Sequence, residues 1–298
     1  MVGSAIWRNL EAKGYSNLIG KTSSELDLRN QLAVQEFFNQ EKLEVVIDAA
    51  AKVGGILANS TLPYSFLMEN LQIQNNLIDT AHQTDVKKFI FLGSSCIYPK
   101  LAPQPLKEEY LLTGPLEPTN EWYAIAKISG VKACEAIRKQ FNKDYVSLMP
   151  TNLYGYFDNF DLQTSHVLPA MLRKFHEAKL NDNAEVVLWG SGTPMREFLF
   201  VDDMADAVVY AFENNLPDSL YNIGTGADLT IKELAETIQR IVGHTGEIIW
   251  DSSKPDGTPR KLMDVSKMTH AGWKAKIELE EGIKRTYAWF LENEGKKV

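Results

Sequence analysis

The first half of the chain alternates between short apolar segments and longer amphipathic ones. Strands are expected at 17–20, 45–49, 88–92 and 145–149, and helices at 4–13, 30–40, 64–83 and 121–141. Strands that alternate with helices form βαβ units, whose strands pair in parallel. The strands are almost entirely apolar, which is typical of strands covered by helices on both faces. The pattern predicts an α/β fold with a parallel sheet.

After Pro150 the alternation is less regular. Helices are expected near 167–178, 204–214, 231–242 and 279–292, with short strands near 186–188, 198–201 and 220–223. Neither an internal repeat nor a low-complexity linker separates this region from the first half. We therefore expect the two parts to pack tightly together.

Composition excludes several classes of protein. The 298 residues are 44% apolar and 23% charged, as in ordinary soluble globular proteins, and are enough for one large or two modest domains. The net charge of −8, without a Lys/Arg cluster, argues against nucleic acid or an anionic membrane as a partner. Cys96 and Cys134 predict neither a disulfide framework nor a metal site. Without a membrane-length apolar run or a signal peptide, a cytoplasmic enzyme or binding protein is expected.

The chain opens with MVGSAIWRNL, which is typical of the end of a dinucleotide-binding glycine turn running into its helix. A dinucleotide fold normally opens with a strand, then this turn, then the helix. We expect Gly3 to be the last glycine of the turn, where helix and strand approach closely. The preceding strand and first glycines are not in the sequence, so either the fold is a different one or the chain starts late, at an internal methionine.

Tyr123 and Lys127 lie four residues apart, on one face of a predicted helix. A free tyrosine has a pKa of about 10, and a neighbouring cation favours the phenolate. The pair can therefore exchange protons near neutral pH, although many solvated helix faces carry the same spacing. Ser94, directly after an apolar strand, could hold a substrate oxygen for that exchange. Thr119 or Asn120 is expected to cap the helix.

Stretches along the whole chain resemble the GDP-L-fucose synthase family, in the extended nucleotide-sugar branch of the short-chain dehydrogenases/reductases. They are GSSCIYPK (93–100), EPTNEWYAIAK (117–127), SHVLPAMLRKFH (165–176), WGSGTPMREF (189–198) and KPDGTPRK (254–261). The resemblance implies a Rossmann-type doubly wound parallel sheet with a smaller α/β substrate domain. It places residues 1–155 and about 197–228 in an NADP-binding domain. Residues from about 156 to 196 and from 229 to 298 would form the nucleotide-sugar domain.

The resemblance also implies the chemistry. That family epimerises GDP-4-keto-6-deoxy-D-mannose at C3 and C5, then reduces C4 with NADPH. Cys96 would be the base and His166 the acid of the epimerisation, with ordinary pKa values of about 8.5 and 6.5. Tyr123 would protonate O4 and Ser94 would polarise it. Lys127 would lower the pKa of Tyr123 and hold the nicotinamide ribose.

Binding roles follow in the same way. The cofactor NADP(H) would be bound by Gly3, Leu26, Asp27, Leu28, Leu92, Gly93, Ser94, Ser95, Lys127, Pro150, Thr151, Asn152, Leu153 and His166. The GDP-sugar would be bound by Lys174, Trp189, Arg196, Asp256 and Lys261. Lys21, Ser23 and Ser24 are compatible with a 2′-phosphate. Relatives commonly form homodimers through the helices equivalent to 64–83 and 121–141.

Two other functions stay open at this point. A nucleotide-sugar 4-epimerase or 4,6-dehydratase keeps Ser94, Tyr123 and Lys127 but needs neither Cys96 nor His166. A binding protein without catalytic activity is also compatible with an incomplete glycine turn. Binding of NADPH separates the enzymes from such a binding protein.

Overall fold

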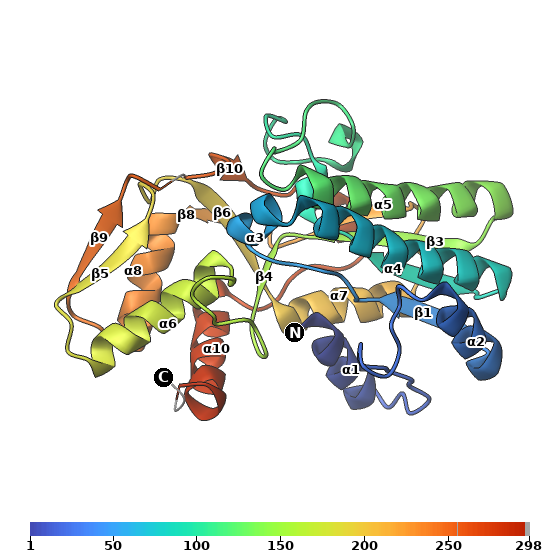
Figure 1. Cartoon of the computed structure of the whole chain (residues 1–298), viewed down its shortest axis with the longest axis horizontal. Coiled ribbons are helices and arrows are strands. Elements are labelled where there is room, and N and C mark those ends of the chain that lie inside the picture. Colours follow the sequence, from blue (N-terminus) through green and yellow to red (C-terminus); the bar gives the residue numbers. More distant parts are fainter. Residues whose placement is uncertain (255, 296–298) are drawn as a thin grey trace.

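The computed structural model describes residues 1–254 and 256–295. Its main sheet is parallel, with the strand order β1 (Val45–Asp48), β2 (Lys88–Leu92), β3 (Asp144–Pro150) and β7 (Leu220–Ile223). Each strand pairs in register, with Val45 opposite Lys88 and Lys88 opposite Asp144. The predicted α/β fold with a parallel sheet is confirmed (Figure 1).

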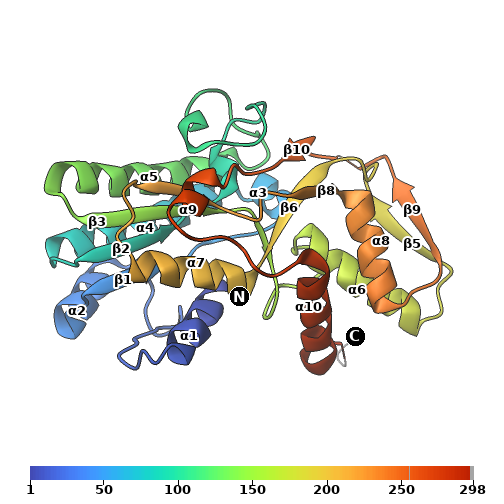
Figure 2. The same cartoon turned by 180° about the vertical axis from the view of Figure 1, so that it is seen from behind.

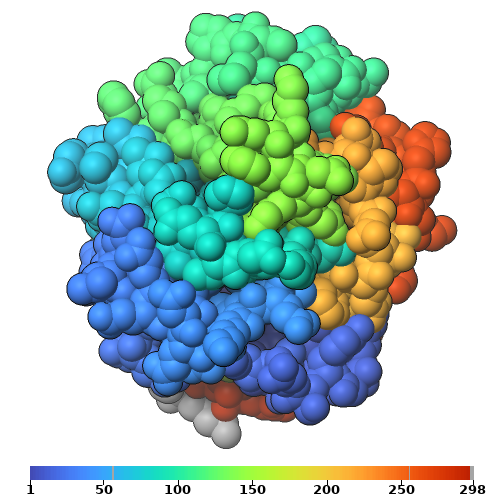
Figure 3. Space-filling model, turned by 90° about the vertical axis from the view of Figure 1, so that its right-hand side faces the viewer, coloured from blue at the N-terminus to red at the C-terminus, as the bar shows by residue number. Residues whose placement is uncertain are grey.

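Helices cover both faces of this sheet (Figures 1 and 2). Side chains of β2 alternate between the faces: Ile90 and Leu92 join one core cluster, and Phe89 and Phe91 join another. The first cluster is covered by α1 (Val2–Ala12) and α7 (Val201–Glu213). The second is covered by α2 (Gln31–Glu41), α4 (Pro63–Gln83) and α5 (Glu121–Phe141). Figure 3 shows the end of the molecule at which the blue, cyan and green segments that contain α2, α4 and α5 lie next to one another.

A second region lies beside the sheet and has its own core. It contains α6 (Val167–Leu180), α8 (Ile231–Val242), α10 (Leu279–Asn293) and the parallel pair β5 (Glu185–Trp189) and β9 (Glu247–Asp251). A further small sheet joins β10 (Arg260–Lys261), β6 (Met195–Phe200) and β4 (Asn152–Tyr154), with β8 (Asp228–Thr230) antiparallel to β6. The domain boundaries given above stay a prediction. Met268 and Trp273, from the end of the chain, pack into the first core.

Several elements have no counterpart in the expected pattern. They are α3 (Ile56–Thr61), α9 (Ser266–His270), the 3₁₀ turns η1 (Ser95–Ile97) and η2 (Glu108–Tyr110), and the strands β4, β8, β9 and β10. Most are too short for hydrophobic periodicity to mark them. No helix within the described residues is long and apolar enough to cross a membrane.

Three expectations are wrong. Residues 17–20 form no strand; they find no strand partner in the described chain, and Leu18 packs against the first core. Val201 begins α7 instead of ending a strand. The side chain of Asn120 makes no capping hydrogen bond at α5, nor does that of Thr119. The expectation for Gly3 stays a prediction, because it concerns a strand that is not in the sequence; within the described residues a Cβ at Gly3 would meet the Ala49 side chain at 3.8 Å.

Candidate active site

Cys96 lies just after the end of β2. The chain leaves Leu92 and turns into η1, where the Ser94 side chain accepts a 3.4 Å hydrogen bond from the backbone N–H of Cys96. Cys96 is only 6% exposed, and burial raises the pKa of its thiol. The cationic side chains of Lys261 and Lys127 and the Ser94 hydroxyl act in the opposite direction. The thiolate is therefore disfavoured by burial and favoured by its neighbours.

Tyr123 and Lys127 come from the first turns of α5, which packs closely on β2. At Gly130 of α5 a Cβ would lie 2.4 Å from the Phe91 ring, so this approach requires glycine. Lys127 is 2% exposed, and its Nζ donates a 2.8 Å hydrogen bond to the carbonyl oxygen of Leu92. The structure thus brings Ser94, Cys96, Tyr123 and Lys127 together, with the Ser94 side chain close enough to Tyr123 to lower its pKa.

Burial dominates the electrostatics of this pair. It raises the pKa of Tyr123, and the nearby Ser94 side chain opposes that effect. Burial also lowers the pKa of Lys127, which the carboxyl group of Asp48 and the thiol of Cys96 oppose. The Lys127 ammonium is hydrogen-bonded to the carbonyl oxygen of Leu92, and its Nζ lies 5.9 Å from the centroid of the Tyr123 ring. Lowering of the Tyr123 pKa by Lys127 stays a prediction for the cofactor-bound protein.

Asp48 is a site residue that the sequence analysis missed. It is the last residue of β1, is 2% exposed, and accepts a 3.0 Å hydrogen bond from the N–H of Ala50 through Oδ1. Its Oδ2 has no partner among the described residues. Burial raises the pKa of this carboxyl group to about 6, against the opposing charge of Lys127. An acidic residue that ends an apolar strand was the available sequence signal.

A small pocket opens beside the Cys96 thiol. Its lining includes Lys100, Glu117, Asn120, Thr258 and Lys261. Burial lowers the pKa of Lys261, and the nearby Arg196 lowers it further. The thiol of Cys96 and the carboxylate of Glu117 have the opposite effect. Lys261 therefore faces the thiol from the β10 side, while Tyr123 and Lys127 face it from α5.

Arg196 lies on β6 with its guanidinium partly free. It donates a 2.8 Å hydrogen bond to the carbonyl oxygen of Met195, and none of the carboxylates in the described chain lies within ion-pair distance. Burial lowers its pKa, which Asp256 opposes. A partly buried, uncompensated guanidinium can bind a diphosphate through two parallel hydrogen bonds.

Asp256 has a structural role in the turn after β5. Its two oxygens accept hydrogen bonds from the Ser191 N–H at 2.7 Å and the Ser191 hydroxyl at 2.8 Å. Gly190 has a φ of 82°, and a Cβ there would lie 2.3 Å from Asp256 Oδ1. The turn presents Trp189, 59% exposed, with the Nζ atoms of Lys174 and Lys254 at 6.0 and 5.5 Å from its ring centroid.

Glu197 is a second residue that the sequence analysis missed. It is fully buried and accepts hydrogen bonds from the N–H groups of Thr225, Gly226 and Met263 at 2.6, 2.7 and 2.9 Å. Its backbone oxygen also accepts from the side chains of Thr151 and Asn152. Glu197 therefore joins the turn after β7 to β10 and to the segment after β3. Its position in an apolar strand gave no sign of this.

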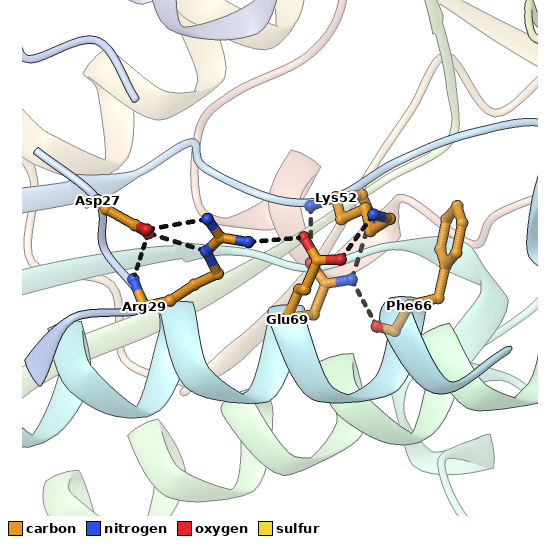
Figure 4. Close-up of polar contacts among 6 residues, drawn as sticks. Asp27, Arg29, Lys52, Phe66 and Glu69 are labelled. Carbon is orange, nitrogen blue, oxygen red and sulfur yellow. Dashed lines mark hydrogen bonds and ion pairs between the residues drawn. The ribbon is translucent and has the colours of Figure 1, made fainter. Parts of the chain in front are cut away.

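The expected adenosine-binding segment is tied to α4 by a chain of charged groups (Figure 4). Arg29 forms two 2.9 Å hydrogen bonds with the carboxylate of Asp27, which lowers the pKa of Asp27 to about 2. Arg29 also reaches Glu69 at 3.4 Å, and Glu69 accepts a 2.7 Å hydrogen bond from Lys52. Asp27 is therefore held by protein groups, and Leu28 packs into the second core.

His166 is the expected catalytic residue that, within the described residues, makes no hydrogen bond to the other four. It precedes α6 and keeps solvent access, while the surrounding protein lowers its pKa. In the described residues no hydrogen bond joins it to Cys96. The backbone oxygen of Thr164, two residues before His166, accepts a 3.4 Å hydrogen bond from the N–H of Gly55, which fixes this segment to the loop after β1.

The residues at the sheet edge fit a dinucleotide. The carboxyl ends of parallel β1, β2 and β3 lie at one edge, where such folds bind nucleotides. The buried Lys127 and the unpartnered Oδ2 of Asp48 lie at this edge with polar groups available to a ligand.

Comparisons with known proteins agree with this arrangement. The NAD dependent epimerase/dehydratase family matches residues 1–224. A putative GDP-L-fucose synthase 2 from Arabidopsis thaliana is 58% identical over 98% of this chain and 89% of that protein. A GDP-L-fucose synthase from Escherichia coli is 55% identical over 99% and 94%.

A solved structure agrees as well. A GDP-L-fucose synthetase from Naegleria fowleri, bound to NADP, has a TM-score of 0.90 and 30% identity, covering 98% of this chain and 90% of that one. The resemblance drawn from the sequence is confirmed. The chain belongs to the NAD dependent epimerase/dehydratase family and, within it, to the GDP-L-fucose synthase group.

Proposed function

We propose that this protein is a GDP-L-fucose synthase, which epimerises GDP-4-keto-6-deoxy-D-mannose at C3 and C5 and reduces C4 with NADPH. The observation that carries the proposal is the placement of a thiol beside a Ser/Tyr/Lys set. Ser94, Tyr123 and Lys127 form the set that serves reduction throughout the family. In 4-epimerases and 4,6-dehydratases no step needs a thiol base at the position of Cys96. Curated relatives of that name at 55% and 58% identity support the same choice.

Epimerisation needs a base and an acid on opposite faces of the sugar ring. The protons on C3 and C5 are acidic because the C4 ketone delocalises the charge of the carbanion onto O4. We assign removal of the proton to the Cys96 thiolate and return of a proton on the other face to His166. Ser94 and Tyr123 donate hydrogen bonds to O4 and stabilise the enolate oxygen.

Reduction uses the same O4. NADPH, when bound, supplies a hydride to C4. Tyr123 donates its phenolic proton to O4, and the adjacent Lys127 stabilises the phenolate that forms. We assign the cofactor to the segments 92–95 and 150–153, to Lys127 and His166, and at its adenosine end to residues 26–28.

GDP is assigned to the second region. Arg196 and Lys261 bind the diphosphate, and Trp189 and Lys174 flank the nucleoside. The role of Asp256 is proposed to be indirect, since both its oxygens already hold Ser191. A homodimer through α4 and α5 is part of the proposal, because these helices expose large apolar side chains such as Tyr64 (74%) and Trp122 (43%).

The experiment is a selectivity assay that follows oxidation of the reduced cofactor. The enzyme should act on GDP-4-keto-6-deoxy-D-mannose with NADPH, and far less on the corresponding UDP sugar or with NADH. Equal rates with GDP and UDP sugars, or conversion of GDP-mannose to its 4-keto-6-deoxy derivative by this protein alone, would contradict the proposal. A protein that binds the GDP-sugar but neither binds NADPH nor turns over any keto sugar would favour a binding protein.

A further inference from the structure

Asn120 begins α5 but does not cap it. Asparagine at the N-cap normally accepts a hydrogen bond from a backbone N–H of the first turn. At α2 the structure shows this arrangement, where the Asn30 side chain accepts from the N–H of Ala33 at 3.2 Å. Asn120 has φ −134° and ψ 17°, and its side chain makes no such bond. The carboxamide of Asn120 therefore does not stabilise the start of α5 by capping.

Among the described residues, the carboxamide of Asn120 has no hydrogen-bond partner although its oxygen is buried. Its Oδ1 makes no hydrogen bond, and no bond to its Nδ2 is present in the described part of the chain. A buried amide oxygen that loses water without gaining a donor is costly, and such groups are rare in folded proteins. A ligand that donates a hydrogen bond removes this cost.

The pocket that Asn120 lines also contains the thiol of Cys96. Most other polar groups there are already occupied. Glu117 pairs with Lys100 at 3.0 Å and accepts from Thr258 at 3.4 Å, and Arg260 pairs with Asp228 at 2.6 Å. Among the described lining residues, Asn120 and Lys261 are the ones whose polar side-chain groups are not paired in this way. Asn120 is thus the neutral polar group left to a ligand beside the thiol.

We propose that Asn120 is a specificity-determining residue that binds a hydroxyl group of the hexose ring, next to the carbon that Cys96 deprotonates. A carboxamide has both a donor and an acceptor, which suits a hydroxyl group. A site with an unpaired polar group that hydrogen-bonds a substrate hydroxyl discriminates strongly against an analogue without that hydroxyl, because the polar group is then left unpaired. The hexose follows from the proposed function, whereas the binding test below needs no turnover.

The first test measures binding by calorimetry, with GDP and GDP-mannose as probes. Asn120→Ala should weaken GDP-mannose about tenfold, as expected for one hydrogen bond, and leave GDP unchanged. Equal losses for both probes, or no loss for either, would overturn the proposal. Because neither probe is turned over, this outcome is independent of whether the protein is a GDP-L-fucose synthase.

The second test separates a ligand contact from a helix cap. Asn30→Ala, which removes an observed capping bond, should lower the melting temperature and leave GDP-mannose binding unchanged. Asn120→Ala should leave the melting temperature unchanged and weaken the binding of GDP-mannose. Asn120→Ser supplies a residue that caps well, yet it should bind GDP-mannose as weakly as the alanine variant. Normal binding by Asn120→Ser, with loss of stability in Asn120→Ala, would identify Asn120 as a cap and overturn the proposal.

The third test identifies the hydroxyl group. Wild type and Asn120→Ala are compared on the keto sugar and on its 2-deoxy and 3-deoxy analogues, by kcat/KM for reduction. If Asn120 binds one of these hydroxyls, the penalty of the substitution should disappear with the analogue that lacks it. A penalty that persists unchanged with both analogues would contradict the assignment.

Discussion

The Nζ of Lys127 donates a 2.8 Å hydrogen bond to the carbonyl oxygen of Leu92, the residue on which β2 ends. This bond joins α5, which carries Tyr123, to the strand that leads into Cys96. Lys127 is almost fully buried, and its Nζ lies 4.7 Å from the centroid of the Phe91 ring. The lysine therefore holds the acid–base residues of the two elements in one arrangement.

Lys127→Met should lower the free energy of unfolding by about 1–3 kcal/mol, because a buried carbonyl loses its partner. Urea denaturation measures this change. Lys132→Met is the matched control: Lys132 is on the same helix but pairs with Glu135 on the surface, so its loss should cost about 1 kcal/mol at most. Equal effects of the two substitutions would show that the Lys127 bond adds no stability.

Tyr123→Phe should reduce the rate of C4 reduction by about a hundredfold or more, because it removes the proton donor. Exchange of the C3 and C5 protons with solvent should continue at a reduced rate, since Cys96, His166 and the Ser94 donor to the enolate oxygen remain while the Tyr123 donor is lost. Cofactor oxidation and deuterium incorporation measure the two activities separately. Loss of both in a protein that still binds NADPH would show that the roles of Tyr123 and Cys96 are not separable.

Lys261→Met should slow alkylation of Cys96 by iodoacetamide at a given pH. The Lys261 ammonium opposes the effect of burial on the thiol, so its removal raises the pKa of Cys96 and lowers the thiolate fraction. The rate measured against pH should shift towards higher pH. Lys100→Met is the control, because Lys100 lines the same pocket but is paired with Glu117. Cys96→Ser gives the background, since Cys134 is fully buried.

Asp48→Asn should stabilise the protein near pH 7. The pKa of Asp48 is raised to about 6 in the folded state, above the unfolded value of about 3.9. The folded protein then binds the proton more tightly, so this group's contribution to stability falls as the pH rises from about 4 to 6. The variant should gain about 2–3 kcal/mol at pH 7 and almost nothing at pH 4. Urea denaturation at both pH values measures the gain, and a pH-independent gain would contradict it.

The sequence predicts well both the parallel sheet and the catalytic pair Tyr123 and Lys127, because both depend on local signals. Apolar strands and helix spacing mark β2, β3, α4 and α5, and the pair Tyr123 and Lys127 lies four residues apart on one helix. Residues 17–20 fail for a non-local reason: a strand needs a neighbour, which local composition does not show. The unpartnered carboxamide of Asn120 is likewise invisible in sequence, where asparagine before a helix indicates a cap.

Contacts between distant segments account for the rest. Glu197 is a single charged residue in an otherwise largely apolar strand, yet it accepts hydrogen bonds from Met263, Thr225 and Thr151 in distant segments. The approach of Lys261 to Cys96 depends on β10 lying next to β6, which two residues of strand cannot reveal. Conversely, the resemblance assigned Asp256 to the substrate, while in the structure it bonds Ser191.

The central claim is that one site epimerises and then reduces the same keto sugar. Its most direct test is the reaction of GDP-4-keto-6-deoxy-D-mannose with NADPH in D₂O, followed by proton NMR of the product. We predict GDP-L-fucose carrying deuterium at C3 and C5, with one NADPH oxidised for each product formed, and no deuterium at either carbon with Cys96→Ser. A reduced sugar formed by the wild type with protons retained at C3 and C5 would contradict the account.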